Sequence, residues 1–235
     1  MVGAHPPVGQ DDAMARKALL GCGILSSLLY VAANIVGPRH WRDYSLSSHT
    51  VSELSAIGAP SRSLVIPLLA AHGALVVPFG VGVWESAGRH RGLRVTGALL
   101  VGLGASDLPA PLFPMHRREA LARGERSRTD TMHIAVTSVN SLLILLAIGF
   151  GSTAFGNRFR LYSTGTILVL VVTGALTATQ ASRVEANLPT PWAGVTERIS
   201  IGGYLAWQVV LAIALLRGVG PRPGGVSRDS APSGC

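Results

Sequence analysis

The sequence predicts an all-α, polytopic membrane protein, a bundle of six transmembrane helices. Three observations lead to this prediction. Of the 235 residues, 48% are hydrophobic and only 14% are charged, whereas soluble domains carry about 25% charged residues. The mean hydropathy of the chain is positive. Six apolar segments, each long enough to supply the roughly 20 residues that cross a bilayer, occupy most of the sequence.

We expect the six spans at residues 18–36, 64–84, 93–113, 131–150, 161–179 and 199–216. Arg16 and Lys17 precede the first span, which contains Val31-Ala32-Ala33, a sequence that resembles a signal-peptidase site. Because this apolar run of about 19 residues exceeds a usual signal core, we interpret it as an uncleaved anchor. The second and third spans, and the fourth and fifth, form hairpins over short connections. The sixth span ends before a segment rich in Gly, Pro and Ser.

The spans and their connections form one domain over residues 16–216. Residues 1–15 and 217–235 are predicted to be flexible cytoplasmic tails, because polar segments with Pro, Gly and Ser cannot bury enough apolar surface to fold. Long and short connections alternate, so the three long connections share one side of the membrane: residues 37–63, 114–130 and 180–198.

The numbers of lysines and arginines do not decide which side the long connections face. Ten basic residues lie in the tails and short connections, and ten lie in the long connections. Arg16 and Lys17 precede the first helix, which usually dominates orientation. We therefore predict a multi-pass protein of the cell membrane with both termini cytoplasmic and the long connections outside.

The net charge of +8 does not predict a nucleic-acid partner. The basic residues lie at the ends of apolar segments rather than on one face, which is the pattern of topology signals. All of them except Lys17 are arginine, and Ala and Gly are abundant, as is typical of bacterial genes of high GC content. Membrane lipids are the expected partners, and the sequence does not specify an oligomeric state.

Charged residues at membrane depth are informative because inserting one at a helix centre costs about 2.5 to 3.5 kcal/mol. Asp107 lies near the outer end of the third span, before Pro109, Pro111 and Pro114, which break regular backbone. Irregular backbone at that depth is tolerated only against protein or a water-lined cavity. Asp107 is therefore a candidate pocket residue.

A polar stripe runs along the fourth span. Asp130, His133, Thr137 and Asn140 step by three, four and three residues and share one helix face. One interpretation is a cavity in which Asp130 charges and orients the His133 imidazole, as in acid–base sites. The other is that Asp130 caps the helix while Thr137 and Asn140 bond to neighbouring helices.

The first long connection contains a capping box, Thr50-Val51-Ser52-Glu53, in which Thr50 caps a short helix and Glu53 reaches back to it. Alternatively, Glu53 faces the same outer cavity as Asp107 and His133. The connection is long for a simple link, and long ordered loops are often functional.

Four more residues complete the polar set on the outer side: His116, Asn187, Glu197 and Arg198. Glu197 and Arg198 could instead pair with each other at the interface. His72, near the middle of the second span, is interpreted as a neutral, hydrogen-bonded core histidine, and the alternative is a place in a proton path.

No metal or cofactor site is predicted. Asp107, His116, Asp130 and His133 are zinc-ligand types, but no two histidines lie four residues apart, and the last span lacks the His-x-x-x-His expected of a ceramidase-like hydrolase. The sequence also contains no phosphate loop, dinucleotide-binding fingerprint, haem motif or Gly-x-Ser-x-Gly elbow.

From about residue 18 to 216, the chain resembles the six-helix bacterial membrane family called domain of unknown function 998, in its actinobacterial branch. The segments that carry the resemblance are Asn34-Ile35-Val36-Gly37-Pro38-Arg39, Thr50-Val51-Ser52-Glu53-Leu54-Ser55-Ala56, Phe113-Pro114-Met115-His116, Thr129-Asp130-Thr131-Met132-His133, and Asn187-Leu188-Pro189-Thr190-Pro191-Trp192 with Glu197-Arg198. The resemblance implies the fold and the number of helices, and it implies no activity.

Three functions remain open. The first is an outward-facing polar pocket that binds a lipid headgroup or a small polar solute, with Glu53, Asp107, His116, Asp130, His133, Asn187, Glu197 and Arg198 as candidate residues. The second is an outer-leaflet enzyme in which His133 and Asp130 act as acid and base, or hold a metal, on a lipid-linked substrate. The third is a structural or accessory membrane protein.

Overall fold

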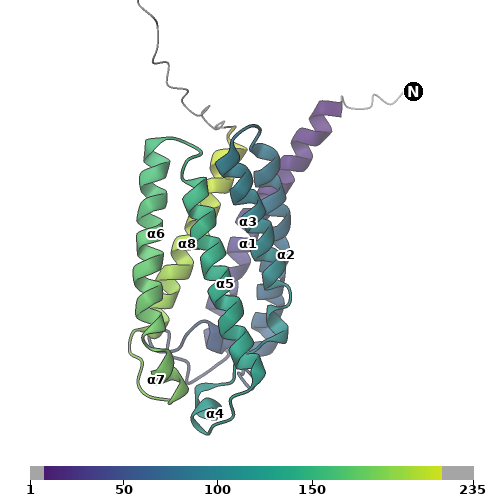
Figure 1. Cartoon of the computed structure of the whole chain (residues 1–235). Coiled ribbons are helices and arrows are strands. Elements are labelled where there is room, and N and C mark those ends of the chain that lie inside the picture. The colour runs from purple at the N-terminus through teal and green to yellow at the C-terminus, as the bar shows by residue number, and fades with distance from the viewer. Residues whose placement is uncertain (1–7, 219–235) are drawn as a thin grey trace, which may run out of the picture.

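Six long helices form the protein, which we describe from a computed structural model over residues 8–218 (Figure 1). All six are long and apolar enough to cross a membrane, which confirms the predicted all-α polytopic bundle. These helices are α1 (Val8–Arg39), α2 (Arg62–Ser86), α3 (Arg91–Asp107), α5 (Arg128–Gly151), α6 (Asn157–Ala178) and α8 (Ala193–Leu216).

Three helix boundaries differ most from the predicted ones. α8 begins at Ala193 rather than near residue 199, so Glu197 and Arg198 belong to the helix and not to the connection before it. α1 begins at Val8, so residues 8–15 of the predicted tail are helical, while residues 1–7 and 219–235 of the two tails lie outside the described part. α3 ends at Asp107 rather than near residue 113. The reason is the proline pair Pro109 and Pro111, whose rings lack the donors that an α-helix needs. The chain continues there as the 3-10 turn η2 (Ala110–Leu112).

The helices form a ring in which each one packs against its neighbours in sequence, in the order α1, α2, α3, α5, α6 and α8, and α8 closes the ring against α1. Glycine allows the closest of these contacts. A Cβ atom on Gly97 of α3 would lie 2.7 Å from the Trp84 backbone nitrogen of α2, and one on Gly80 would lie 2.6 Å from the Val101 nitrogen. The two backbones therefore touch, as small residues permit in membrane helix pairs.

The half of the ring nearer the termini is filled by a dense apolar core. Phe79, Leu100, Ile148, Trp207 and Leu211 are all fully buried within it. This half is therefore closed to both water and lipid.

A buried hydrogen-bond network crosses the bundle at the edge of this core. The Gln208 amide of α8 donates to the Ser26 and Ser27 hydroxyls of α1 at 2.7 and 3.0 Å, and it accepts from the Tyr204 hydroxyl at 2.6 Å. His72 lies close by, with Nδ1 bonded to the Ser26 carbonyl at 3.0 Å and its ring edge-on to Tyr30. That placement fits a satisfied core histidine.

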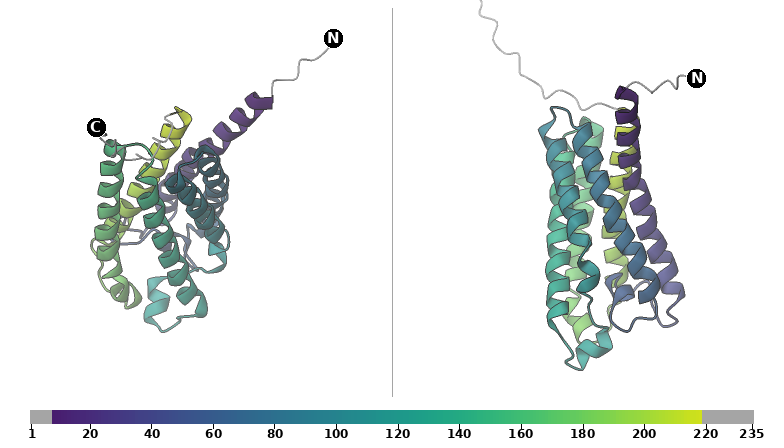
Figure 2. Two further views of the ribbon diagram at one scale, coloured as in Figure 1. Left: turned by 45° about the horizontal axis from the view of Figure 1, so that its top comes forward. Right: turned by 90° about the vertical axis from the view of Figure 1, so that its right-hand side faces the viewer.

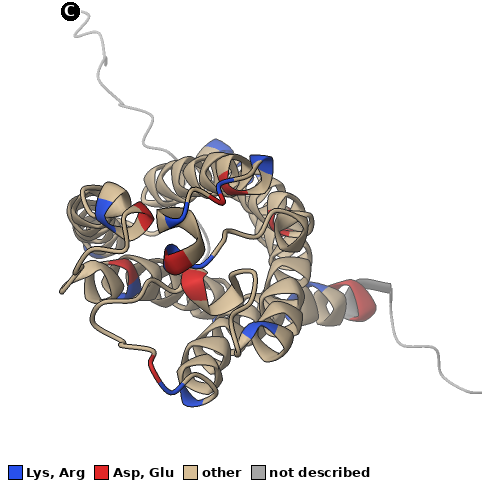
Figure 3. Cartoon of the chain, turned by 90° about the horizontal axis from the view of Figure 1, so that it is seen from below, with Lys and Arg blue, Asp and Glu red and all other residues tan. Residues whose placement is uncertain are grey.

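The three long connections gather at the end of the bundle opposite the two ends of the described chain (Figure 1 and Figure 2). We call these connections, residues 40–61, 108–127 and 179–192, the cap. They contain the short helices η1 (Ser52–Ser55), α4 (Arg118–Ala122) and α7 (Ala181–Glu185). Viewed from the cap end, acidic and basic residues lie over the centre of the ring (Figure 3).

Candidate functional site

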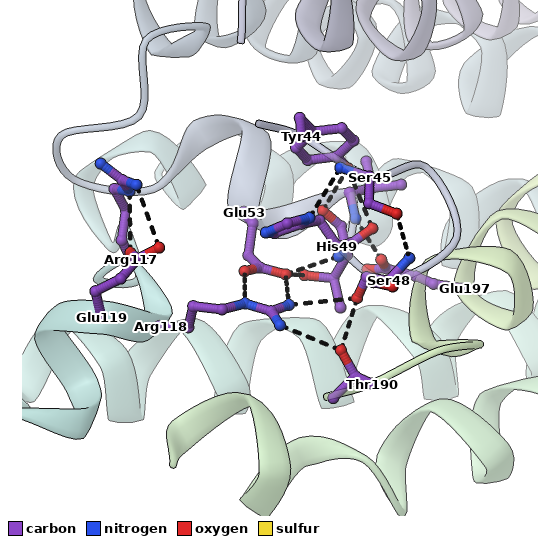
Figure 4. A network of polar contacts seen from close by, with 12 residues as sticks. Tyr44, Ser45, Ser48, His49, Glu53, Arg117, Arg118, Glu119, Thr190 and Glu197 are labelled. Carbon is purple, nitrogen blue, oxygen red and sulfur yellow. Dashed lines mark hydrogen bonds and ion pairs between the residues drawn. The ribbon is translucent and has the colours of Figure 1, made fainter. Parts of the chain in front are cut away.

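A buried ion pair joins the first two connections of the cap (Figure 4). Arg118 donates from Nε and Nη2 to the two carboxylate oxygens of Glu53, both at 2.7 Å. The remaining donors reach the Thr190 hydroxyl at 3.2 Å and the Ser48 carbonyl at 3.3 Å. Glu53 and Arg118 are only 1% and 7% exposed. This fork-on-fork pair, with its other donors satisfied, ties all three connections together.

Glu53 also makes the backbone contact that its capping box predicts. The Thr50 N–H donates to Glu53 Oε2 at 2.7 Å. The Thr50 hydroxyl turns to the same oxygen, at 3.1 Å, instead of capping a helical N–H. Glu53 thus closes a local turn, as the first interpretation predicts, and also holds a distant arginine.

Glu197 and Arg198 anchor the start of α8 to the first connection rather than to each other. Glu197 accepts the Val51 N–H, and Arg198 donates to the Leu46 carbonyl at 2.9 Å and to the Tyr44 hydroxyl at 2.5 Å. These bonds fix α8 beneath the cap. They leave Arg198 bound to loop carbonyls rather than to a carboxylate.

His49 packs in the middle of this network as a neutral ring. Its Nδ1 accepts the Ser45 N–H at 3.0 Å, and its ring stacks on Tyr44. Burial lowers the pKa of His49, because desolvation disfavours the imidazolium more than the nearby Glu53 charge favours it. Protonation would also remove the lone pair that accepts from Ser45.

The fold should therefore lose stability in acid. Because the folded pKa of His49 lies below its unfolded value of about 6.5, the unfolded chain takes up the proton first, and the free energy of unfolding falls as pH drops below that value. We expect thermal unfolding to show less stability at pH 5.5 than at pH 7.5, with a smaller difference in His49→Asn. A His40→Asn control, at an exposed histidine, should keep the wild-type difference, and an unchanged difference in His49→Asn would contradict this assignment.

Asp130 binds His116, not His133. One Asp130 oxygen accepts the His116 backbone N–H at 2.7 Å, and the other lies 2.8 Å from His116 Nδ1 and 2.8 Å from the Ser127 nitrogen, completing a capping box at the start of α5. His133 Nδ1 bonds to the Phe113 carbonyl at 3.1 Å. These contacts fix the α3–α5 connection over the end of α5.

Asp107 and Asn140 join α3 to α5 below the cap. Asn140 donates to one Asp107 oxygen at 2.7 Å and accepts from the Ser106 hydroxyl. In the part of the chain that the structure describes, the second Asp107 oxygen has no hydrogen-bond partner, and no basic side chain pairs with it. Asp107 is thus a carboxyl group at membrane depth with only a neutral partner.

The surface of the cap holds a cavity of about 390 Å³, lined by Trp41, Asp43, His49, Arg117, Arg118, Glu119, Asn187, Leu188 and Pro189. Asn187 is the one predicted candidate that lines it. Arg117 lies over the Trp41 ring and pairs with Glu119 at 3.2 Å, and Arg118 is held by Glu53. The two arginines that line the cavity are therefore already neutralised by neighbouring side chains.

One polar face of α5 is uncovered below the cap. Thr137 and Ser141 lie three and two helical turns before Ile148, so all three residues share one face. Ile148 is completely buried in the core, whereas Thr137 and Ser141 are exposed. Exposed Val139 and Leu146 occupy the opposite face, toward lipid. The inward face of α5 is thus uncovered in its cap-side half.

α5 and α6 meet at their short connection and separate toward the cap (Figure 1). α5 packs extensively on α3 but makes few contacts with α6. α6 stays beside α8 at this end, where Thr177 of α6 bonds to Thr196 of α8 at 2.7 Å.

Asp107 and Asn140 lie below the cap and bond to each other. Glu53, His116, Asp130 and Arg198 instead make their contacts within the cap or to it. The predicted candidates thus divide into a cap group and a pair that joins α3 to α5.

The sequence did not indicate Arg118, Thr190, Tyr44 or His49 as site residues. Arg118 is one of five arginines between residues 114 and 130 and resembles a topology signal. A clue was available in its neighbours Glu119 and Leu121, because an Arg-Glu-Ala-Leu-Ala run predicts a short helix. Nothing in the sequence names Glu53 as its partner.

Over residues 8–218, no three His, Cys, Asp or Glu side chains are grouped so that they could hold a metal ion. Neither a curated protein nor a solved structure matches the chain. A family model does match, over residues 24–214, from within α1 to near the end of α8, and this range includes the whole cap. The chain therefore belongs to the family described as "Protein of unknown function (DUF998)".

Proposed function

We propose that this membrane protein binds the headgroup of a lipid in the interior region between α5 and α6, beneath the cap. The observation that carries the proposal is the exposure of Thr137 and Ser141 on the same helix face as the buried Ile148. Membrane helices normally bury inward-facing polar residues or pair them, and polar groups at this depth usually serve a site.

The surroundings of this region favour a lipid over a solute from water. The cap covers it from the aqueous side with the buried residues Glu53, Arg118 and Thr190. The apolar core around Ile148 and Trp207 closes it from the other half of the bundle. The remaining route runs sideways between α5 and α6, from the surrounding lipid of the membrane.

We further propose that both termini are cytoplasmic and that the protein lies in the cell membrane, so that the lipid comes from the outer leaflet. Arg16 and Lys17 before the first apolar run support this orientation. Trypsin added outside intact cells should then cut near Arg123 and Arg126 in the cap. Cleavage only after the cells are opened would reverse the orientation.

The arrangement of the histidines favours binding over catalysis. A general base needs a nucleophile within hydrogen-bond reach. His133 is bonded to a backbone carbonyl and His116 to Asp130. Two serines near these residues, Ser52 and Ser106, have other partners, since Ser52 bonds to Glu197 and Ser106 to Asn140.

The test places a bulky side chain on the uncovered face of α5 and counts the lipids that the purified protein retains. We expect native mass spectrometry of the detergent-purified protein to show one tightly held phospholipid in the wild type and its loss in Thr137→Trp. Val139→Trp places the same side chain on the lipid-facing side of α5 and should retain the lipid. Equal retention by both variants, or a wild type without lipid, would refute the proposal.

A further inference from the structure

We propose that the lipid held between α5 and α6 carries a primary ammonium headgroup, as aminophospholipids do, and that Asp107 is its counter-charge. This inference rests on the proposed function and names its ligand class. Asp107 differs from the other acidic side chains in this half of the protein in how few hydrogen-bond partners it has.

Three other acidic side chains that are shielded from water in this half of the protein are satisfied by protein groups. Glu53 holds Arg118, Asp130 holds His116 and two groups of Ser127, and Glu197 binds the Val51 N–H beside Arg198. Asp107 has only the Asn140 amide, which compensates no charge. An uncompensated carboxylate at membrane depth is costly, so a cationic ligand would find there a counter-charge that the protein has left free.

The carboxyl group is also held in position before any ligand arrives. Asn140 fixes one oxygen at 2.7 Å. Gly73 of α2 lets Asp107 approach closely, since a Cβ atom on Gly73 would lie 2.6 Å from the Asp107 Cβ. The second oxygen is therefore presented on rigid helices rather than on a loop, which lowers the ordering cost of binding.

The neighbouring groups suit a primary rather than a quaternary ammonium. A primary ammonium has three N–H donors, and the free Asp107 oxygen is an acceptor for one of them. A quaternary ammonium has no N–H to donate to that oxygen and is recognised instead by a cage of aromatic rings.

The uncovered face of α5 would hold the phosphate of the same headgroup. Thr137 lies one helical turn from Asn140 on the inward face of α5, and its hydroxyl has no hydrogen-bond partner among the described residues. The acyl chains would then lie outside, along the exposed apolar residues of α5 and α6 such as Leu142, Val172 and Leu176.

The experiment compares three phospholipids with identical acyl chains, carrying ethanolamine, choline or glycerol headgroups, titrated onto delipidated protein and followed by native mass spectrometry. We expect the wild type to bind the ethanolamine lipid about tenfold or more tightly than either of the others, the factor that one hydrogen bond to a charged group supplies. Asp107→Asn, which can still accept from Asn140, should bind all three alike. Asp43→Asn, at an exposed cap carboxylate, should keep the preference.

The outcomes separate this inference from the proposed function. Equal binding of the three lipids by the wild type, with loss of all three in Thr137→Trp, overturns the ammonium and leaves the lipid site. No binding of any lipid overturns both. If Asp107→Asn does not fold, dicyclohexylcarbodiimide labelling of wild-type Asp107 decides: protection by the ethanolamine lipid alone supports the inference, and equal or absent protection by the three lipids refutes it.

Discussion

Replacing Glu53 by alanine is expected to lower the free energy of unfolding by about 3 to 5 kcal/mol, the usual cost of removing one partner of a buried ion pair. The change would leave the Arg118 guanidinium, 7% exposed, without a counter-charge inside the cap. It would also free the Thr50 N–H that Glu53 accepts. Thermal or SDS unfolding in detergent micelles measures the loss.

Two further variants test whether the unpaired charge causes the loss of stability. Glu125→Ala removes a partner of Arg123 from an exposed pair with the same short contact, and it should leave the unfolding curve unchanged because solvent screens such pairs. The double variant Glu53→Leu/Arg118→Met should regain most of the stability, since apolar residues often replace a buried pair without loss. A Glu53→Ala protein as stable as Glu125→Ala would show that the pair contributes nothing.

Gly97→Ala is expected to destabilise the bundle by about 1 to 3 kcal/mol, the range observed when a methyl group is forced into a packed interior. The new Cβ would meet the Trp84 nitrogen at 2.7 Å and the Gly80 carbonyl oxygen at 2.8 Å. Both are backbone atoms of α2, so no side-chain rotation relieves the overlap and the two helices must separate.

Gly102→Ala is the matched control in the same helix, because nothing lies within 4 Å of the Cβ it would add. It should be neutral or slightly stabilising, since alanine favours helix over glycine. Unfolding midpoints of the two variants in one detergent give the comparison. Equal midpoints would mean that the α2–α3 contact is looser than the structure has it.

Much of the fold follows from local signals in the sequence. The lengths of the apolar segments predict six helices, and all six are present. Pro109 and Pro111 predicted irregular backbone, and α3 does end before them at Asp107. The reach of Glu53 back to Thr50 was likewise predictable, because a capping box depends on residues three apart.

The pairing of the polar residues does not follow from such signals. Asp130 and His133 share a helix face, which suggested that they interact. A helical side chain tilts toward the N-terminus of its helix, however, and there Asp130 meets Ser127 and His116 from the preceding connection. Arg118 and Glu53 are 65 residues apart and come together only in the folded bundle. The separation of α5 and α6, which exposes Thr137, is also a property of the whole ring.

The attachment of α8 to the first connection has a consequence for biosynthesis. Glu197 and Val51 are 146 residues apart, and a chain emerging from the ribosome folds its N-terminal part first. The Val51 N–H and the Tyr44 hydroxyl therefore cannot meet Glu197 and Arg198 until the last helix has been synthesised. The cap is complete only after that step, so we expect a chain truncated before α8 to leave the first connection unattached and more sensitive to proteolysis.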